Sequence, residues 1–162
     1  MAEPSSTAIV GAALSEVGRV DDTTVYTLAW QAASRALADA GLTHSDVDGL
    51  FSNEPGILAP VELAEYLGLR PDYLDGTQVG GSSWVIMLEH AMAAISAGLC
   101  DVALIVSAST TRADLTRRLR TSNVSLGARG PSQYDAPWGH SLISKYAMAA
   151  RRHMHEFGTT ID

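Results

Sequence analysis

The stretch from Asp75 to Thr110, DGTQVGGSSWVIMLEHAMAAISAGLCDVALIVSAST, constrains the fold of this chain more than any other. It begins with a short strand-like run, passes through the glycine pair Gly80–Gly81, and continues as a long alanine-rich helical segment. It ends in an uninterrupted apolar run, which is typical of a strand in a sheet covered on both faces. A strand, a glycine turn, a helix and a second strand in this order predict a parallel β-α-β unit.

The residues around this stretch extend it into a layered α/β fold of the order β-α-β-α-β-α-β with short links. Strands are expected at Thr7–Ala12, Leu50–Ser52, Gly76–Val79 and in the run DVALIVSAS from Asp101. Helices are expected at Thr24–Ala40, in PVELAEYLGL from Pro60, and at Ser83–Ala97. The apolar stripe expected for the first helix is Leu28, Ala32, Ala36 and Ala40, and that of the third is Trp84, Leu88, Ala91 and Ile95. Gly41, Gly68 and Gly98 each follow a helix, where a left-handed cap is often required.

The character of the sequence changes after Thr110, so we divide the chain into an α/β core over residues 1–110 and a second region over residues 111–162. The segment TRADLTRRLRTSNVSLGARGPSQYDAPWGH is basic and then rich in glycine and serine. It is too long for a plain connection inside a compact domain, which indicates a loop excursion with a function or a contact. One further helix is expected at about Ser141–Phe157. We interpret the chain as an apparently truncated half-domain, either a fragment or a split subunit.

Composition limits the class of partner. The 162 residues carry a formal net charge of -7, and 46% of them are hydrophobic. This favours a soluble globular protein, and it argues against nucleic acid or an anionic membrane as the main partner, because such binding relies on concentrated Lys and Arg. The single cysteine, Cys100, excludes an internal disulfide and a cysteine-based zinc site. With neither a signal peptide nor a membrane-spanning run, we expect a cytoplasmic protein without a resident metal.

Gly80, Gly81 and Ser82 form the candidate binding site. Glycine lets the main chain approach a ligand closely, and the first N–H groups of the following helix are unpaired at the positive end of its dipole. Such a turn suits a thioester oxygen, an oxyanion or a phosphate. The alternative is a purely structural turn in which Ser82 or Ser83 caps the helix. A serine nucleophile is not favoured, because His90 lies about two turns along the same helix and cannot serve as its base.

The other chemically active side chains give weaker signals. Cys100 is expected to be a buried small hydrophobe, since the adjacent Asp101 has the wrong charge to stabilise a thiolate. His153 and His155 lie on different faces of a helix and do not have the spacing of metal ligands. The basic cluster can contact the phosphates of a large anionic cofactor, although a solvated face or a subunit contact also explains it. The cluster consists of Arg112, Arg117, Arg118 and Arg120, and it is followed by Tyr134, Trp138 and His140 as loop anchors or pocket-lining residues.

The glycine turn, the helix ending in AISAGLCDVALIVSAS, and the later YAMAARRHMHEFGTT together resemble the N-terminal half of the thiolase superfamily over nearly the whole chain. In the register of that resemblance the superfamily's nucleophilic cysteine falls on Gly81, and a small glycine falls on Trp84. The turn GTQVGGSSW is similar to that of the cysteine-free branch, which comprises lipid-transfer proteins and aldolases of steroid side-chain degradation.

The resemblance implies carbon–carbon bond cleavage of a β-hydroxyacyl-CoA, such as a steroid side-chain thioester, by a retro-aldol route. Coenzyme A would enter as part of the substrate and no cofactor would be bound; Gly80, Gly81 and Ser82 would hold the thioester oxygen, and Arg117 and Arg118 are possible contacts for the CoA phosphates. No catalytic acid or base is identified in this chain, because the branch places them in its C-terminal half. The resemblance also implies a homodimer formed through Gly76–Val79 and the helix from Ser83, and a partner made of an OB-fold and a zinc ribbon.

Two alternatives remain open at the level of sequence. One is a non-catalytic acyl-CoA-binding, sterol-binding or lipid-transfer scaffold that dimerises. The other is a working thiolase with Cys100 as nucleophile, for which the position of the cysteine is unfavourable.

Overall fold

The computed structural model describes residues 7–56, 58–116, 134 and 142–161 of the chain. It divides into two compact units, Met1–Thr116 and Arg117–Asp162. The elements of the first unit are α1 (Val25–Asp39), the short 3-10 helix η1 (His44–Asp46), β1 (Gly49–Phe51), α2 (Ala59–Leu67), β2 (Tyr73–Asp75), α3 (Ser83–Ser96), β3 (Ala103–Ile105) and α4 (Thr111–Thr116). The second unit contributes α6 (Leu142–Phe157), which confirms the helix expected there.

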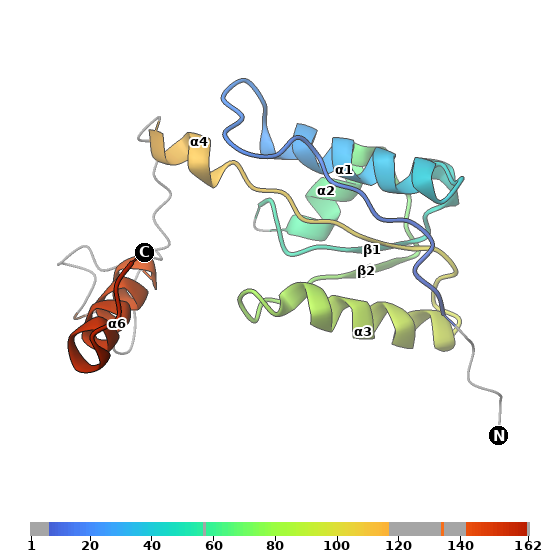
Figure 1. The fold of residues 1–162 in the computed structure, drawn as a ribbon. Helices are drawn as coiled ribbons and strands as arrows, with labels where there is room; N and C mark the ends of the chain where they lie inside the picture. The colour runs from blue at the N-terminus through green and yellow to red at the C-terminus, as the bar shows by residue number, and fades with distance from the viewer. Residues whose placement is uncertain (1–6, 57, 117–133, 135–141, 162) are drawn as a thin grey trace. The chain divides into compact units, whose positions relative to one another are not determined.

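The centre of the first unit is a parallel sheet with the strand order β2-β1-β3. Leu50 of β1 lies opposite Leu74 of β2 on one side and Leu104 of β3 on the other. Helices α1 and α2 cover one face of the sheet, and α3 covers the other (Figure 1). The predicted layered α/β fold is therefore confirmed, with both faces of the sheet covered as the apolar strand at Asp101 indicated.

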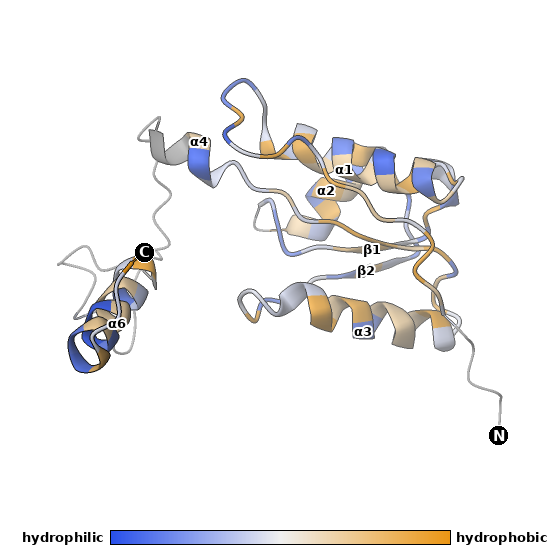
Figure 2. Cartoon of the chain, in the orientation of Figure 1, coloured by the Kyte–Doolittle hydropathy of each residue, from blue (hydrophilic) through white to orange (hydrophobic). Residues whose placement is uncertain are grey.

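Alternation along the strands builds two separate cores. Leu50 and Leu104 pack with α1 and α2, whereas the next residue in β1, Phe51, packs with Met87 and Ala91 of α3. Successive strand residues point to opposite faces, so a strand of three residues can serve both cores. The apolar colouring of α3 in Figure 2 extends around much of the helix, beyond the side that packs on the sheet.

The helix limits follow from local capping chemistry. The Thr24 side chain accepts a hydrogen bond from the Thr27 N–H at 3.1 Å and starts α1. Gly41, Gly68 and Gly98 have positive φ angles of 69°, 69° and 70° after the first three long helices, as expected. The buried faces differ from the expected stripes. They are Leu28, Ala29, Ala33 and Leu37 in α1, and Ser83, Met87, Ala91 and Ala94 in α3.

Two strand predictions are wrong. Thr7–Ala12 is not a strand: Ile9 and Val10 are 75% and 64% exposed, and the Ala12 N–H donates to the Asp39 carboxylate at 3.1 Å. The segment packs on α1, where a Cβ atom on Gly11 would meet the Ala36 carbonyl oxygen at 2.3 Å. The third strand is Tyr73–Asp75 rather than Gly76–Val79, because the main chain beyond Asp75 leaves the sheet.

Within the ranges that the structure describes, none of the helices has the length and apolarity needed to cross a membrane.

Candidate functional site

The two glycines before α3 differ in backbone conformation, although a Cβ atom built on either of them would have no neighbouring atom within 4 Å. Gly80 has a φ of +74°, a left-handed conformation that strongly favours glycine. Gly81 has no such φ, and a Cβ atom built on it would have no neighbouring atom within 4 Å. Backbone conformation therefore accounts for glycine at position 80, whereas at position 81 the missing side chain leaves open space beside the turn.

Ser83 stabilises the turn through two hydrogen bonds of its buried hydroxyl group. It is fully buried, its Oγ accepts a hydrogen bond from the Val79 N–H at 3.0 Å, and the same hydroxyl donates to the Gly80 carbonyl oxygen at 2.6 Å. Ser82 occupies the N-cap position but is exposed, and its side chain makes no capping hydrogen bond. Ser83 is thus a structural residue, and its hydroxyl is already engaged on both its donor and acceptor sides.

The N-terminus of α3 presents main-chain N–H groups that can act as hydrogen-bond donors. In the described part of the chain, the N–H groups of Trp84 and Val85 have no hydrogen-bond acceptor. Regular helical bonding begins with Ile86, whose N–H donates to the Ser82 carbonyl at 3.2 Å. Unpaired donors at the positive end of a helix dipole can stabilise an anion or a developing oxyanion that approaches the turn.

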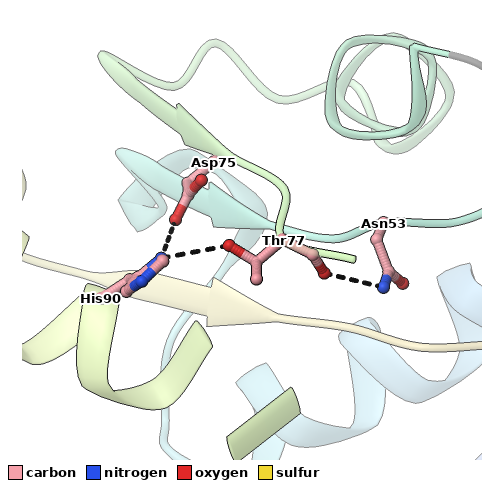
Figure 3. Close-up of polar contacts among 4 residues, drawn as sticks. All are labelled: Asn53, Asp75, Thr77 and His90. Carbon is pink, nitrogen blue, oxygen red and sulfur yellow. Dashed lines mark hydrogen bonds and ion pairs between the residues drawn. The ribbon is translucent and has the colours of Figure 1, made fainter. Parts of the chain in front are cut away.

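A polar network holds the segment that leads from β2 into this turn (Figure 3). His90 Nδ1 of α3 lies 2.5 Å from Asp75 Oδ2, at the end of β2, and 3.3 Å from Thr77 Oγ1. Asn53, just after β1, donates from Nδ2 to the Thr77 carbonyl oxygen at 2.9 Å. The network lies beyond the carboxyl ends of parallel strands, which is where open α/β sheets commonly bind ligands.

The sequence does not predict this pairing, because the partner of His90 lies fifteen residues earlier, on a strand. His90 is seven residues into α3 from Ser83, which places it about 10 Å along the helix axis from the turn. We therefore assign the His90–Asp75 pair to positioning the turn rather than to contact with a ligand held there. No sequence signal short of the folded β-α unit joins these two residues.

The remaining described candidates behave largely as expected. Cys100 is buried beside Gly49, and burial, followed by the charges of Asp48 and Asp101, raises the pKa of its thiol. This confirms Cys100 as a small buried hydrophobe rather than a nucleophile. His153 packs against Phe157 and lies within hydrogen-bonding distance of Thr159, at 3.0 Å.

His155 is exposed, as is Arg112 in α4, and Tyr134 is also exposed. Arg117, Arg118, Arg120, Trp138 and His140 lie outside the described residues. Within the described ranges, no group of three or more His, Cys, Asp and Glu side chains is placed to hold a metal ion.

No protein-family model matches the chain. It is 28% identical to a steroid side-chain-cleaving aldolase of Thermomonospora curvata, over 98% of this chain and 42% of that protein. It is 30% identical to a 17-hydroxy-3-oxo-4-pregnene-20-carboxyl-CoA lyase of Mycobacterium tuberculosis, over 94% and 41%. An acetyl-CoA acetyltransferase of Methanothermobacter thermautotrophicus is 26% identical, over 94% and 40%. The chain thus spans about two fifths of the length of these relatives.

Among solved structures, the Ltp2-ChsH2(DUF35) aldolase matches 94% of this chain and 39% of its own chain, with a TM-score of 0.69 and 28% identity. The similarity in sequence and in structure supports the resemblance to the thiolase superfamily, and the fold of this chain is thiolase-like.

Proposed function

We propose that this chain is the N-terminal half of a thiolase-like protein that cleaves a carbon–carbon bond in a β-hydroxyacyl-CoA, such as a steroid side-chain thioester. The observation that carries the proposal is Gly81. In the register of the resemblance it takes the place of the thiolase cysteine, and a Cβ atom on it would meet no atom within 4 Å, just ahead of the unpaired N–H groups of α3. Two relatives named as an aldolase and a lyase match nearly the whole chain, which favours carbon–carbon bond cleavage.

The proposed reaction is a retro-aldol cleavage. A general base removes the proton of the β-hydroxyl group, and the electrons of the O–H bond form a ketone carbonyl as the Cα–Cβ bond breaks. The electron pair of that bond passes into the thioester and forms an enolate, whose oxygen carries the negative charge. Protonation of the enolate carbon then gives a shortened acyl-CoA. No acyl group becomes bound to the protein at any step.

In this proposal, the role of the chain is to stabilise the negatively charged enolate intermediate. Gly80, Gly81 and Ser82 form the contact surface for the thioester, and the N–H groups of Trp84 and Val85 face the developing oxyanion. Such preorganised donors commonly contribute a factor of about 10²–10³ each to the rate. The acid and base belong, in this proposal, to the part of the relatives that this chain does not match.

The partners in the proposal are a second copy of the protein and a small OB-fold and zinc-ribbon protein. Val85 and Met92 are exposed on α3, and a helix that is apolar on several sides is normally covered. In the described sheet β2 is an edge strand, which together with α3 offers a self-complementary surface. The name of the Ltp2-ChsH2(DUF35) aldolase, which joins two proteins, supports a heterocomplex. Arg117 and Arg118 are proposed to contact the CoA phosphates.

A binding role without catalysis is the second candidate. The described turn contains donors but neither a nucleophile nor a base within reach, which is the chemistry of an acyl-CoA-binding scaffold. The two candidates differ in turnover, since both predict binding of a thioester at the same turn.

The test uses the full-length protein with its partner and a steroidal β-hydroxyacyl-CoA carrying a three-carbon side chain. We expect propionyl-CoA and a steroid ketone in equal amounts, measured by liquid chromatography and mass spectrometry, with no acyl adduct on the intact protein. Gly81→Val, which fills the open space, should abolish turnover, while Glu16→Gln, at an exposed carboxylate outside α3, should not change it. Binding without products would favour the scaffold, and an acyl adduct would refute the proposal.

A further inference from the structure

A recess between α1 and α2, on the face of the first unit opposite α3, combines aromatic rings with carboxylates. Four residues line its volume of about 340 Å³: Tyr26, Glu62, Glu65 and Tyr66. The two tyrosine rings meet with centroids 5.1 Å apart and planes tilted by 35°, so they form an open corner. Tyr26 is partly buried and packs against the core beneath α1 and α2, whereas Tyr66 is 49% exposed.

The hydrogen bonds of the recess fix its shape. The Tyr26 hydroxyl donates to Glu62 Oε2 at 2.9 Å, and the Leu58 N–H donates to Glu62 Oε1 at 3.3 Å. On the other ring, the Tyr66 hydroxyl lies 3.3 Å from Thr27 Oγ1. The hydrogen bond donated to Glu62 raises the pKa of Tyr26. The aromatic corner and one carboxylate are therefore held in place before any ligand arrives.

The charge of the recess is not neutralised by the described part of the chain. Glu62 and Glu65 are three residues apart on α2 and thus lie on the same side of the helix. No Lys, Arg or His among the described residues forms an ion pair with either carboxylate. Two like charges at this spacing oppose helix formation, and the aromatic rings beside them attract cations through their faces.

We propose that this recess binds an arginine side chain of a protein partner. A guanidinium group is planar, so it can stack on a tyrosine ring while its N–H groups bond to a carboxylate. The residues flanking the recess point to a protein as the source. Trp30, Leu58 and Val61 are exposed at 47%, 62% and 51%, and in protein interfaces such groups around an arginine anchor exclude water from it.

The experiment titrates the full chain with acetyl-glycyl-arginyl-glycinamide and observes ring signals of the five tyrosines by NMR after selective ¹³C labelling. We expect saturable shifts at Tyr26 and Tyr66 only, with Tyr73, Tyr134 and Tyr146 as internal controls. The same peptide with citrulline, a neutral isostere of arginine, should bind at least about threefold more weakly, because the carboxylates act on the charge.

Two variants with the same charge change sharpen the result. Glu65→Gln should lower the affinity for the arginine peptide by about threefold or more. Glu89→Gln, which changes an exposed carboxylate on α3, should leave that affinity unchanged. Equal binding of the arginine and citrulline peptides, equal effects of the two variants, or the absence of saturable shifts at both recess tyrosines would each overturn the proposal. A circular dichroism spectrum of each variant confirms that the fold is retained.

Discussion

Replacing Gly80 and Gly81 one at a time tests whether the turn contains one structural glycine and one that leaves space. Gly80 has a φ of +74°, and an L-residue in this region costs about 1–2 kcal/mol. At Gly81 a Cβ atom would have no neighbour within 4 Å and φ is not positive. We therefore expect Gly80→Ala to lower the free energy of unfolding by about 1–2 kcal/mol, and Gly81→Ala to change it by no more than about 0.5 kcal/mol.

Urea unfolding followed by circular dichroism measures both variants in the full chain. For a chain of this size the expected loss for Gly80→Ala corresponds to a Tm lower by roughly 2–8 °C. The denaturant slope should be the same in both variants and the wild type, because the surface exposed on unfolding does not change. If Gly81→Ala destabilises the protein as much as Gly80→Ala, the turn does not have the open space on which the proposed function depends.

Gly81→Cys extends the test to chemistry. A thiol at the head of α3 lies at the positive end of the helix dipole, which lowers a thiol pKa below about 8.5. The native Cys100 is an internal control, because burial raises its thiol pKa. At pH 7.5 iodoacetamide should alkylate the introduced thiol at least about tenfold faster than Cys100, as read by peptide mass spectrometry. Equal rates would show that the turn neither exposes nor activates a group at position 81.

Three further predictions concern bonds in the first unit, each measured as a free energy of unfolding. Ser83→Ala should cost about 1–3 kcal/mol because it removes both bonds of a buried hydroxyl, whereas Ser82→Ala should stay within about 0.5 kcal/mol. Asp48→Ala should cost about 1.5–3 kcal/mol because its carboxylate accepts from two main-chain N–H groups ahead of β3, and equal stability would contradict this. The hydrogen bond to Glu62 raises the pKa of Tyr26 above its ordinary value of 10.0. The stability that this bond contributes is therefore present below pH 10 and is lost as the pH rises through the higher pKa of Tyr26 in the folded state. Tyr26→Phe should lose less stability than the wild type over that pH range.

The helices of this chain could be predicted because their ends depend on local chemistry. Thr24 caps α1 through a bond to a residue three positions ahead, and Gly41 and Gly68 supply left-handed caps that other residues adopt at a cost. These signals involve neighbours in sequence, so the sequence alone contains the information. The glycine turn before α3 belongs to the same class, and its position was predicted correctly.

The strands and the buried helix faces depend on partners distant in sequence. The segment at Ile9 and Val10 has the composition of a strand, but it packs along α1 and leaves both side chains exposed. Tyr73 enters the sheet because its N–H donates to the Asp48 carbonyl, 25 residues earlier. In α3 small and apolar residues surround the helix, so periodicity could not show that Met87 rather than Leu88 faces the core.

The candidate site likewise contains features that depend on sequence neighbours and features that depend on residues distant in sequence. Gly80, Gly81 and Ser82 could be found from sequence, because a glycine pair ahead of a helix is a local pattern. Two other contacts form only when the folded sheet brings β1, β2 and α3 together. They are the hydrogen bond between His90 and Asp75 and the hydrogen bond from Asn53 to the loop after β2. The different roles of Gly80 and Gly81 also depend on their φ angles, which a sequence does not display.

In the proposed function, the electrostatics of α3 give a reason why glycine in the place of a thiol is compatible with activity. The positive end of a helix dipole acts like about half an elementary positive charge, so two anions at the same helix end would compete for it. In a cysteine-dependent enzyme part of that stabilisation acts on the thiolate. With glycine at position 81, the proposed function makes the unpaired N–H groups of Trp84 and Val85 available to a substrate oxygen, and the open space beside Gly81 lets that oxygen approach. Under this proposal the helix terminus suits an enolate better without the sulfur than with it.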